Sequence, residues 1–96
     1  ADGYKGIVKI DITNINSPNI ELTKDTPGNA NELKIIPNSN YLLLADDNEG
    51  VKLINKSDLE TAATFSVQDK AKAIALTKEG SKAVVASAGD GVYILQ

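Results

Sequence analysis

Short apolar runs, separated by turn residues, follow one another along the whole chain. Each run has about four to six residues, the length of a β-strand, whereas a helix shows apolar positions at a period of about 3.6 over a longer stretch. No such helical stretch occurs in the sequence. The pattern predicts nine strands, over residues 7–12, 20–24, 33–36, 41–45, 51–55, 63–67, 73–76, 83–87 and 92–95.

The residues between these strands have the composition of hairpin turns. Residues 37–40, 46–50, 78–81 and 88–91 contain Asn, Asp, Gly or Ser, which favour the left-handed backbone of tight turns or form turns with their side chains. One strand differs from the others, since residues 41–45 are apolar without alternation. We expect this strand to be covered on both faces of its sheet.

The chain repeats one pattern, a glycine followed by an aliphatic strand. The pattern begins at Gly6, Gly50 and Gly91, at spacings of 44 and 41 residues. The residues that precede the glycine also match at the spacing of 44 residues. Both residues 1–2 and residues 45–46 are Ala-Asp. A period of about 40–45 residues is that of the four-stranded blade of a β-propeller.

The predicted fold class is therefore all-β, with tandem four-stranded antiparallel blades of a β-propeller, about two in number, that form an incomplete ring. Residues 1–28 are expected to form a partial blade, residues 29–69 a full blade and residues 70–96 a second partial blade. Blades bury their apolar faces against one another, so closure of the ring needs more of them. Further blades of the same polypeptide or copies of the chain in a homo-oligomer would both supply them.

The first unit also resembles a known repeat family. Residues 1–14 are similar to the Ala-Asp-x-x-x-Gly hairpin and aspartate-ended strand of LVIVD-repeat β-propellers, and Ser17-Pro18 and residues 25–28 are similar to the loops that follow. The second unit keeps Gly50, but Asn55 stands where the first unit has aspartate. The resemblance implies a propeller fold. WD-repeat and NHL-type propellers share the blade length, but their signatures are missing from this sequence.

Composition and charge argue against several classes of function. The chain is 42% hydrophobic and 24% charged, as globular proteins are, and only 4% aromatic, so aliphatic side chains must fill its core. Its net charge of -3 argues against a nucleic-acid partner, which needs clustered cations. No apolar run reaches the length of about 18 residues that a membrane span requires. Because His and Cys are both absent, we expect no enzyme and no cofactor.

Acidic residues recur at the hairpins that precede the repeated glycine. Asp46, Asp47, Glu49 and Asp90 are the candidate metal ligands, because Ca²⁺ prefers several carboxylate and carbonyl oxygens. Their spacing matches no EF-hand loop, and tight turns favour Asp and Asn for conformational reasons. We therefore expect these residues to serve the turns, and we assign no metal and no catalytic residue.

The expected function follows from the way a propeller displays its loops. A rigid ring presents loops from several blades to one partner. We expect a non-enzymatic protein-interaction or scaffold module with a protein partner, located outside the cell or at the cell surface. The alternative is a ligand-binding module that recognises carbohydrate or calcium through the repeated hairpin loops. A carbohydrate could stack on an exposed tyrosine ring. Tyr4 is the tyrosine expected to be exposed, whereas Tyr93 is expected to lie in the core.

Overall fold

The structure, a computed structural model, describes residues 1–89 and 91–95. Within these residues the chain forms nine strands and no helix, so the all-β prediction is confirmed. The described chain accordingly offers no helix that is long and apolar enough to cross a membrane. The strands are β1 (Ile7–Asp11), β2 (Asn19–Lys24), β3 (Glu32–Ile35), β4 (Tyr41–Ala45), β5 (Val51–Asn55), β6 (Thr61–Phe65), β7 (Lys70–Leu76), β8 (Ala83–Ala88) and β9 (Gly91–Leu95).

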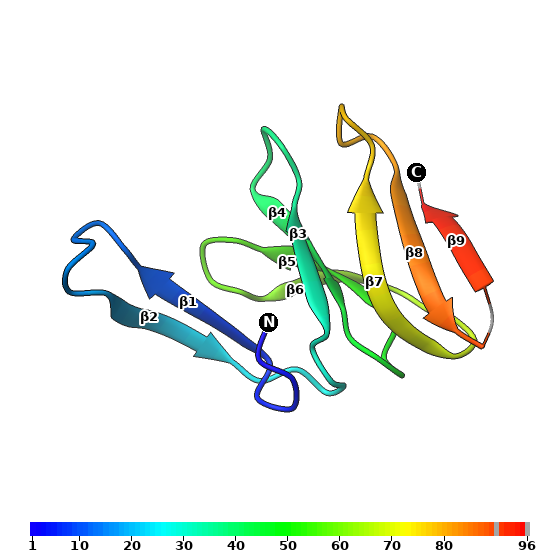
Figure 1. Ribbon diagram of the computed structural model, residues 1–96, viewed down its shortest axis with the longest axis horizontal. Coiled ribbons are helices and arrows are strands. Elements are labelled where there is room, and N and C mark those ends of the chain that lie inside the picture. Colours follow the sequence, from blue (N-terminus) through cyan, green and yellow to red (C-terminus); the bar gives the residue numbers. More distant parts are fainter. Residues whose placement is uncertain (90, 96) are drawn as a thin grey trace.

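The strands form three antiparallel sheets, each built from strands that are consecutive in the sequence (Figure 1). The first sheet joins β1 and β2, the second joins β3 to β6 in order, and the third joins β7 to β9. The pairing of β1 with β2 shifts register between Lys9 and Ile10, and the pairing of β5 with β6 shifts between Leu53 and Ile54. These two irregularities lie 44 residues apart. The two register shifts therefore have the same spacing as Gly6 and Gly50.

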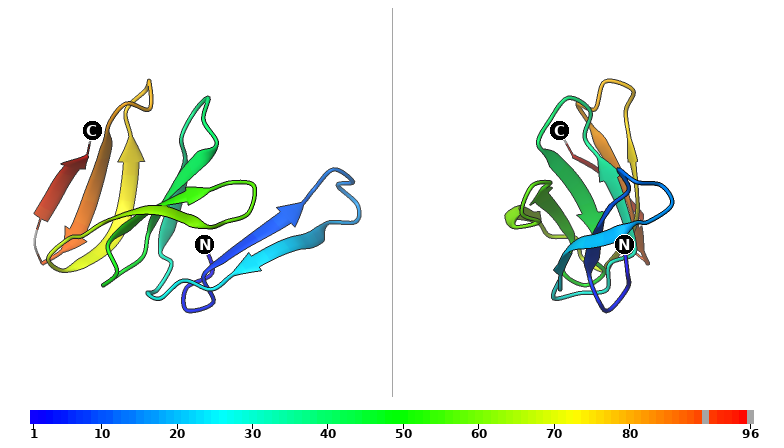
Figure 2. Two further views of the ribbon diagram at one scale, coloured as in Figure 1. Left: turned by 180° about the vertical axis from the view of Figure 1, so that it is seen from behind. Right: turned by 90° about the vertical axis from the view of Figure 1, so that its left-hand side faces the viewer.

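The second sheet lies between the other two and is covered on both faces (Figure 2). In β4, Leu42 and Leu44 belong to the buried cluster shared with the first sheet, whereas Leu43 and Ala45 belong to the cluster shared with the third. All four side chains are buried. This arrangement explains why residues 41–45 are apolar without alternation and confirms the expectation that both faces are covered.

Two hairpins connect successive sheets through hydrogen bonds of the main chain. In the first, the N–H of Gly3 donates to the carbonyl of Ala30 at 3.0 Å, and the N–H of Ala30 donates to the carbonyl of Gly3 at 2.9 Å. In the second, Asp47 and Ala71 exchange the same pair of bonds, at 3.2 and 2.9 Å. The same local link between sheets thus occurs twice at equivalent positions.

The glycines that end these hairpins have the backbone that the turns require. Gly6 and Gly50 have φ values of 84° and 82°, which side chains rarely tolerate. A Cβ at either position would also collide with a main-chain carbonyl, that of Lys24 or that of Phe65. The repeated glycine is therefore fixed both by conformation and by close approach.

The strand β7 is three residues longer than the sequence predicts. β7 begins at Lys70, three residues before the predicted start at residue 73. Lys70 and Lys72 interrupt the apolar pattern of the sequence. The strand nevertheless stays paired with β8 back to Lys70, with a register shift between Ala71 and Ala73. β6 begins and ends two residues earlier than predicted, and its last residue, Phe65, lies opposite Val51, the first residue of β5. The remaining strands agree with the prediction to within one residue at each end.

Candidate interaction surfaces

Each sheet of the stack has two faces, and the face of the second sheet toward the third is made of aliphatic side chains. Leu43 and Ala45 of β4 and Val51 and Leu53 of β5 form it. Ala45 lies opposite Val51, and Leu43 lies opposite Leu53, in the strand pairing. These four side chains pack together with buried residues of the third sheet.

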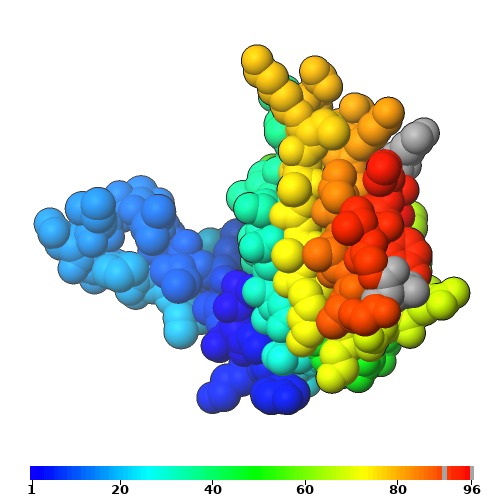
Figure 3. All heavy atoms as spheres, turned by 45° about the vertical axis from the view of Figure 1, so that its right-hand side comes forward, coloured from blue at the N-terminus to red at the C-terminus, as the bar shows by residue number. Residues whose placement is uncertain are grey.

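The outer face of the third sheet repeats this arrangement 41 residues later, but nothing in the described chain covers it. Val84, Ala86, Val92 and Ile94 stand at the corresponding positions, with Ala86 opposite Val92 and Val84 opposite Ile94. Val92 and Ile94 are 66% and 64% exposed. Figure 3 shows β7, β8 and β9 side by side at the surface, in yellow, orange and red. We call these four side chains the end face.

The opposite faces of the second and third sheets are also equivalent. The residues of the second sheet that pack against the first lie 41 residues before those of the third sheet that pack against the second. The pairs are Ala30 and Ala71, Leu33 and Ile74, Leu42 and Ala83, Leu44 and Val85, and Ile54 and Leu95. One type of contact between sheets is therefore used twice in this chain.

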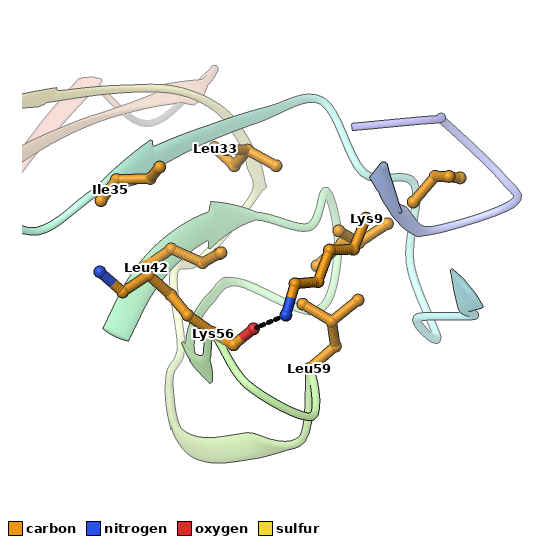
Figure 4. Close-up of a pocket in the computed structure, with 8 residues that line it drawn as sticks. Lys9, Leu33, Ile35, Leu42, Lys56 and Leu59 are labelled. Atoms are coloured by element: carbon orange, nitrogen blue, oxygen red, sulfur yellow. Dashed lines mark hydrogen bonds between the residues drawn. The ribbon is translucent and has the colours of Figure 1, made fainter. Parts of the chain in front are cut away.

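The contact between the first and second sheets is incomplete. β7 of the third sheet lies against β3 and β4. In the part of the chain that the structure describes, the first sheet consists of β1 and β2, which correspond to β5 and β6. An apolar groove of about 200 Å³ is left beside β3 and β4 (Figure 4). Ile35 in this groove is 58% exposed, whereas Leu76, its counterpart in the third sheet, is partly buried against the second sheet.

One side of the groove is β1, which has an unpaired edge. In the described chain β1 pairs with β2 alone, whereas its counterpart β5 has a strand on each side. Lys9 of β1 occupies the position of the apolar Leu53 and points toward the loop after β5, where its Nζ donates to the carbonyl of Lys56 at 3.2 Å (Figure 4). The same Nζ lies 3.6 Å from Oε1 of Glu21. The groove thus combines apolar walls, a charged rim and an open strand edge.

Asp46, the first of the candidate metal ligands, is fully buried in the second hairpin. Its Oδ1 accepts a hydrogen bond from Oγ1 of Thr26 at 2.8 Å, and its Oδ2 accepts one from the N–H of Gly28 at 3.2 Å. The missing side chain of Gly28 permits this approach, because a Cβ there would collide with the main chain of Asp46. The carboxylate therefore anchors the link between the first and second sheets.

The other candidate ligands do not join Asp46 in a cation site. Oδ1 of Asp47 lies 2.9 Å from Nζ of Lys72, and Glu49 is exposed. Asp90 lies outside the described residues. Over residues 1–89 and 91–95, no three acidic side chains come together in a group that could hold a metal ion. The carboxylates of Asp46 and Asp47 have protein partners instead.

The pairing of Asp47 with Lys72 is expected to make stability depend on pH. The hydrogen bond from Lys72 is the main cause that lowers the pKa of Asp47; burial opposes it, and a hydrogen bond from Asn31 adds to it. Because the pKa is lower in the folded state, the interaction stabilises the fold above the unfolded pKa and is lost as the pH falls through the folded value. We expect the free energy of unfolding of the Asp47→Asn protein to fall less steeply than that of the unaltered protein below about pH 5. Urea unfolding at several pH values measures this.

Glu49→Gln, at the exposed neighbour of the same turn, is the matched control and should keep the original acid dependence. If the Asp47→Asn protein loses stability on acidification as steeply as the unaltered protein does, the pair with Lys72 has no such role.

The three tyrosines lie on separate elements. Tyr4 is exposed in the first hairpin, and Tyr93 of β9 packs partly buried against the cluster between the second and third sheets, both as the sequence predicts. Tyr41, at the start of β4, is also exposed, although its strand is otherwise buried. Tyr4 and Tyr41 are therefore the tyrosines that a ligand could reach.

The strands β1 and β5 end in the same side-chain motif, which was not predicted from the sequence. Oδ1 of Asp11 accepts hydrogen bonds from the N–H and hydroxyl of Thr13, at 2.9 and 2.6 Å. Oδ1 of Asn55 accepts the same two bonds from Ser57, at 3.0 and 2.8 Å. Asx turns of this kind are indicated by Asp or Asn two residues before Thr or Ser. Residues 55–57 also fit the acceptor pattern for N-glycosylation, but their equivalent at residues 11–13 shows that the turn itself accounts for them.

No protein-family model, no curated protein and no solved structure matches this chain. The end face and the groove are both uncovered apolar surfaces of the described chain.

Proposed function

We propose that the chain is a non-enzymatic interaction module, a segment of an LVIVD-like β-propeller whose stacked sheets form a scaffold for protein partners. The end face carries this proposal. Four apolar side chains that are covered in the second sheet have exposed counterparts in the third, with the same strand pairing. An uncovered apolar face of this kind is characteristic of an interaction site.

The repeated contact between sheets supports a particular kind of partner for the end face. In the second sheet, the equivalent face packs against a β-sheet through Ala71, Ile74, Ala83 and Val85. The end face is therefore suited to another sheet of the same kind. Further blades of the same polypeptide or copies of this chain in a ring would provide such a sheet.

The side-chain chemistry also supports a non-enzymatic role. The sequence has no His and no Cys to act as base, nucleophile or soft metal ligand. The buried carboxylate of Asp46 is held by Thr26 and Gly28. Calcium binding at the hairpin loops, which was the alternative, finds no acidic cluster to support it in the part of the chain that the structure describes.

Association through the end face is expected to be lost in Val92→Asp and in Ile94→Asp. The unaltered chain should self-associate as its concentration rises, because the end face is uncovered. A charge placed in the contact must be desolvated without a partner, which opposes association. Since both side chains are exposed, each substitution should cost the fold about 1 kcal/mol or less. Sedimentation equilibrium over a range of concentrations measures the association, and thermal unfolding measures the fold.

Ile15→Asp is the matched control for these two variants. Ile15 is equally apolar and 84% exposed, but it lies in the loop between β1 and β2, away from the third sheet. It should leave association unchanged. A chain that stays monomeric at every concentration, or one whose association Ile15→Asp weakens as much as Ile94→Asp does, would count against the proposal.

A further inference from the structure

We infer that a pocket between the first and second hairpins binds a neutral sugar, such as a hexose at the end of a glycan. The ring of Tyr4 would stack on the sugar, and polar side chains of the other walls would hydrogen-bond to its hydroxyl groups. The inference goes beyond the proposed function, because it concerns a small ligand and a surface other than the end face. All the walls of this pocket belong to residues 4–70.

The pocket lies where the two hairpins meet the segment that joins β2 to β3, at the lower edge of the stacked sheets (Figure 1). Its walls are Tyr4 of the first hairpin, residues 27–29 of the joining segment, residues 47–49 of the second hairpin and Lys70 of β7. Its volume of about 310 Å³ is at the lower end of the range of about 300–1,000 Å³ for small-molecule sites, which suits a single sugar ring.

The walls of the pocket are held in place by hydrogen bonds that do not involve a ligand. The first hairpin is fastened to the joining segment by the pair of main-chain bonds between Gly3 and Ala30. The second hairpin is fastened to it by Oδ2 of Asp46, which accepts a hydrogen bond from the N–H of Gly28. A ligand therefore enters a site whose shape is already formed, which lowers the entropic cost of binding.

Tyr4 gives the pocket an aromatic wall that the turn itself does not require. Tyr4 is 84% exposed, and its counterpart in the second hairpin, at the spacing of 44 residues, is Asn48. Tight turns favour Asn for conformational reasons, so turn formation explains Asn48 but not Tyr4. An exposed aromatic ring beside polar groups provides a flat apolar surface on which the C–H face of a sugar can stack.

The polar side chains around this ring offer the hydrogen-bonding groups that hydroxyls need. Asn48 and Glu49 are both exposed in the second hairpin, and they supply an amide and a carboxylate. Oδ1 of Asn29 is buried and has no hydrogen-bond partner among the residues that the structure describes. A buried acceptor without a partner is unfavourable. A turn of this side chain toward the pocket would give the acceptor a sugar hydroxyl as its donor.

The charges of the pocket favour a neutral ligand. Asp47 is paired with Lys72, whose Nζ lies 2.9 Å from its Oδ1. The remaining charged groups of the walls are Glu49 and Lys70, which have opposite signs. A metal ion would need several acidic side chains together, and the described residues contain no such group. An anion would be repelled by the carboxylates of the second hairpin.

Titration of the isotope-labelled full chain with simple sugars tests the inference. The probes are the methyl α- and β-glycosides of glucose, galactose and mannose, followed by nuclear magnetic resonance. We expect at least one of them to cause saturable shifts of the amides of Tyr4, Asn29 and Glu49. Tyr4→Ala should raise the Kd about fivefold or more, whereas Tyr4→Phe, which keeps the ring, should change it by about twofold or less. Glu49→Ala should raise the Kd about threefold or more.

Tyr41→Ala is the matched control, because it removes another exposed tyrosine, at the start of β4, that does not line the pocket. It should leave the Kd unchanged. Ile94→Asp should also leave it unchanged, since the end face is a separate surface. The sugar site and the association through the end face can therefore fail independently of each other. The amide spectrum of each variant shows whether its fold is retained.

Three results would overturn the inference. The first is that no glycoside causes saturable shifts at the pocket, or that the Tyr4→Ala protein binds as tightly as the unaltered protein. The second is that methyl glucuronoside, the charged match of the glucoside, binds more tightly than the glucoside, which would make the pocket an anion site around Lys70. The third is that a chelator abolishes binding, which would show that a metal ion holds the sugar.

Discussion

Leu44→Ala is expected to lower the free energy of unfolding by about 3–4 kcal/mol. Leu44 is fully buried in the cluster that joins the first and second sheets. Its truncation leaves a cavity that Ile7 and Ile54 cannot fill, because they belong to different sheets whose strand pairing fixes their positions. A protein of this size has a total stability of about 5–15 kcal/mol, so the variant should unfold at a much lower urea concentration.

Circular dichroism is the suitable readout for this experiment, because the chain has no Trp to report by fluorescence. Ile15→Ala, in the loop between β1 and β2, is the matched control and should change the stability by about 0.5 kcal/mol or less. If the two variants lose the same amount of stability, the sheets are not packed through Leu44.

Asp46→Ala is expected to cost about 2–4 kcal/mol. The substitution removes the acceptor of the Thr26 hydroxyl and of the Gly28 N–H. Thr26 is itself buried, so its hydroxyl loses a partner where water cannot easily replace it. Urea unfolding measures the loss, with Glu49→Ala at the exposed position of the same hairpin as the control. A loss below about 0.5 kcal/mol would show that the carboxylate does not hold the two sheets together.

The same variant separates this structural role from calcium binding. If the carboxylate of Asp46 has a structural role alone, the Asp46→Ala protein is less stable than the unaltered protein even in the presence of a chelator. Ca²⁺ then does not raise the melting temperature of the unaltered protein. Calcium binding at the hairpins would instead give a rise that grows with the concentration of Ca²⁺. We expect no rise, because both carboxylate oxygens of Asp46 are already engaged.

The short apolar runs and the turn residues between them were sufficient to find the strands, and the lack of alternation was sufficient to place one strand inside. Residues 41–45 lack alternation, and β4 is indeed covered on both faces. The start of β7 was missed because Lys70 and Lys72 have charged ends that remain exposed while their strand stays paired. Charge alone does not end a strand when the side chain points to solvent.

The roles of the acidic residues could not be predicted from the sequence. Asp46 and Asp47 are neighbours in one turn and look equivalent, yet one is buried and the other pairs with Lys72. The partners of Asp46 precede it by about twenty residues and meet it only when the first and second sheets stack. Residue type and turn position therefore indicated a candidate ligand, while the stacking of sheets determined what the carboxylate contacts.

The groove was also beyond sequence reasoning, for a related reason. Ile35 has the sequence context of a core residue, at the end of a predicted strand. Its exposure is a property of the neighbouring sheet, which within the described residues has two strands where the second sheet has four. The pattern of a strand shows that it has an apolar face, but it does not show whether that face is covered.

Because every sheet pairs only strands that are consecutive in the sequence, the contact order within each sheet is low for an all-β protein. Each hairpin closes a short loop, so the entropic barrier that slows most β-proteins is small here. Duplication or deletion of a whole unit would therefore leave the pairing of the remaining strands unchanged. A chain with this topology can lengthen or shorten by one unit at a time and still fold.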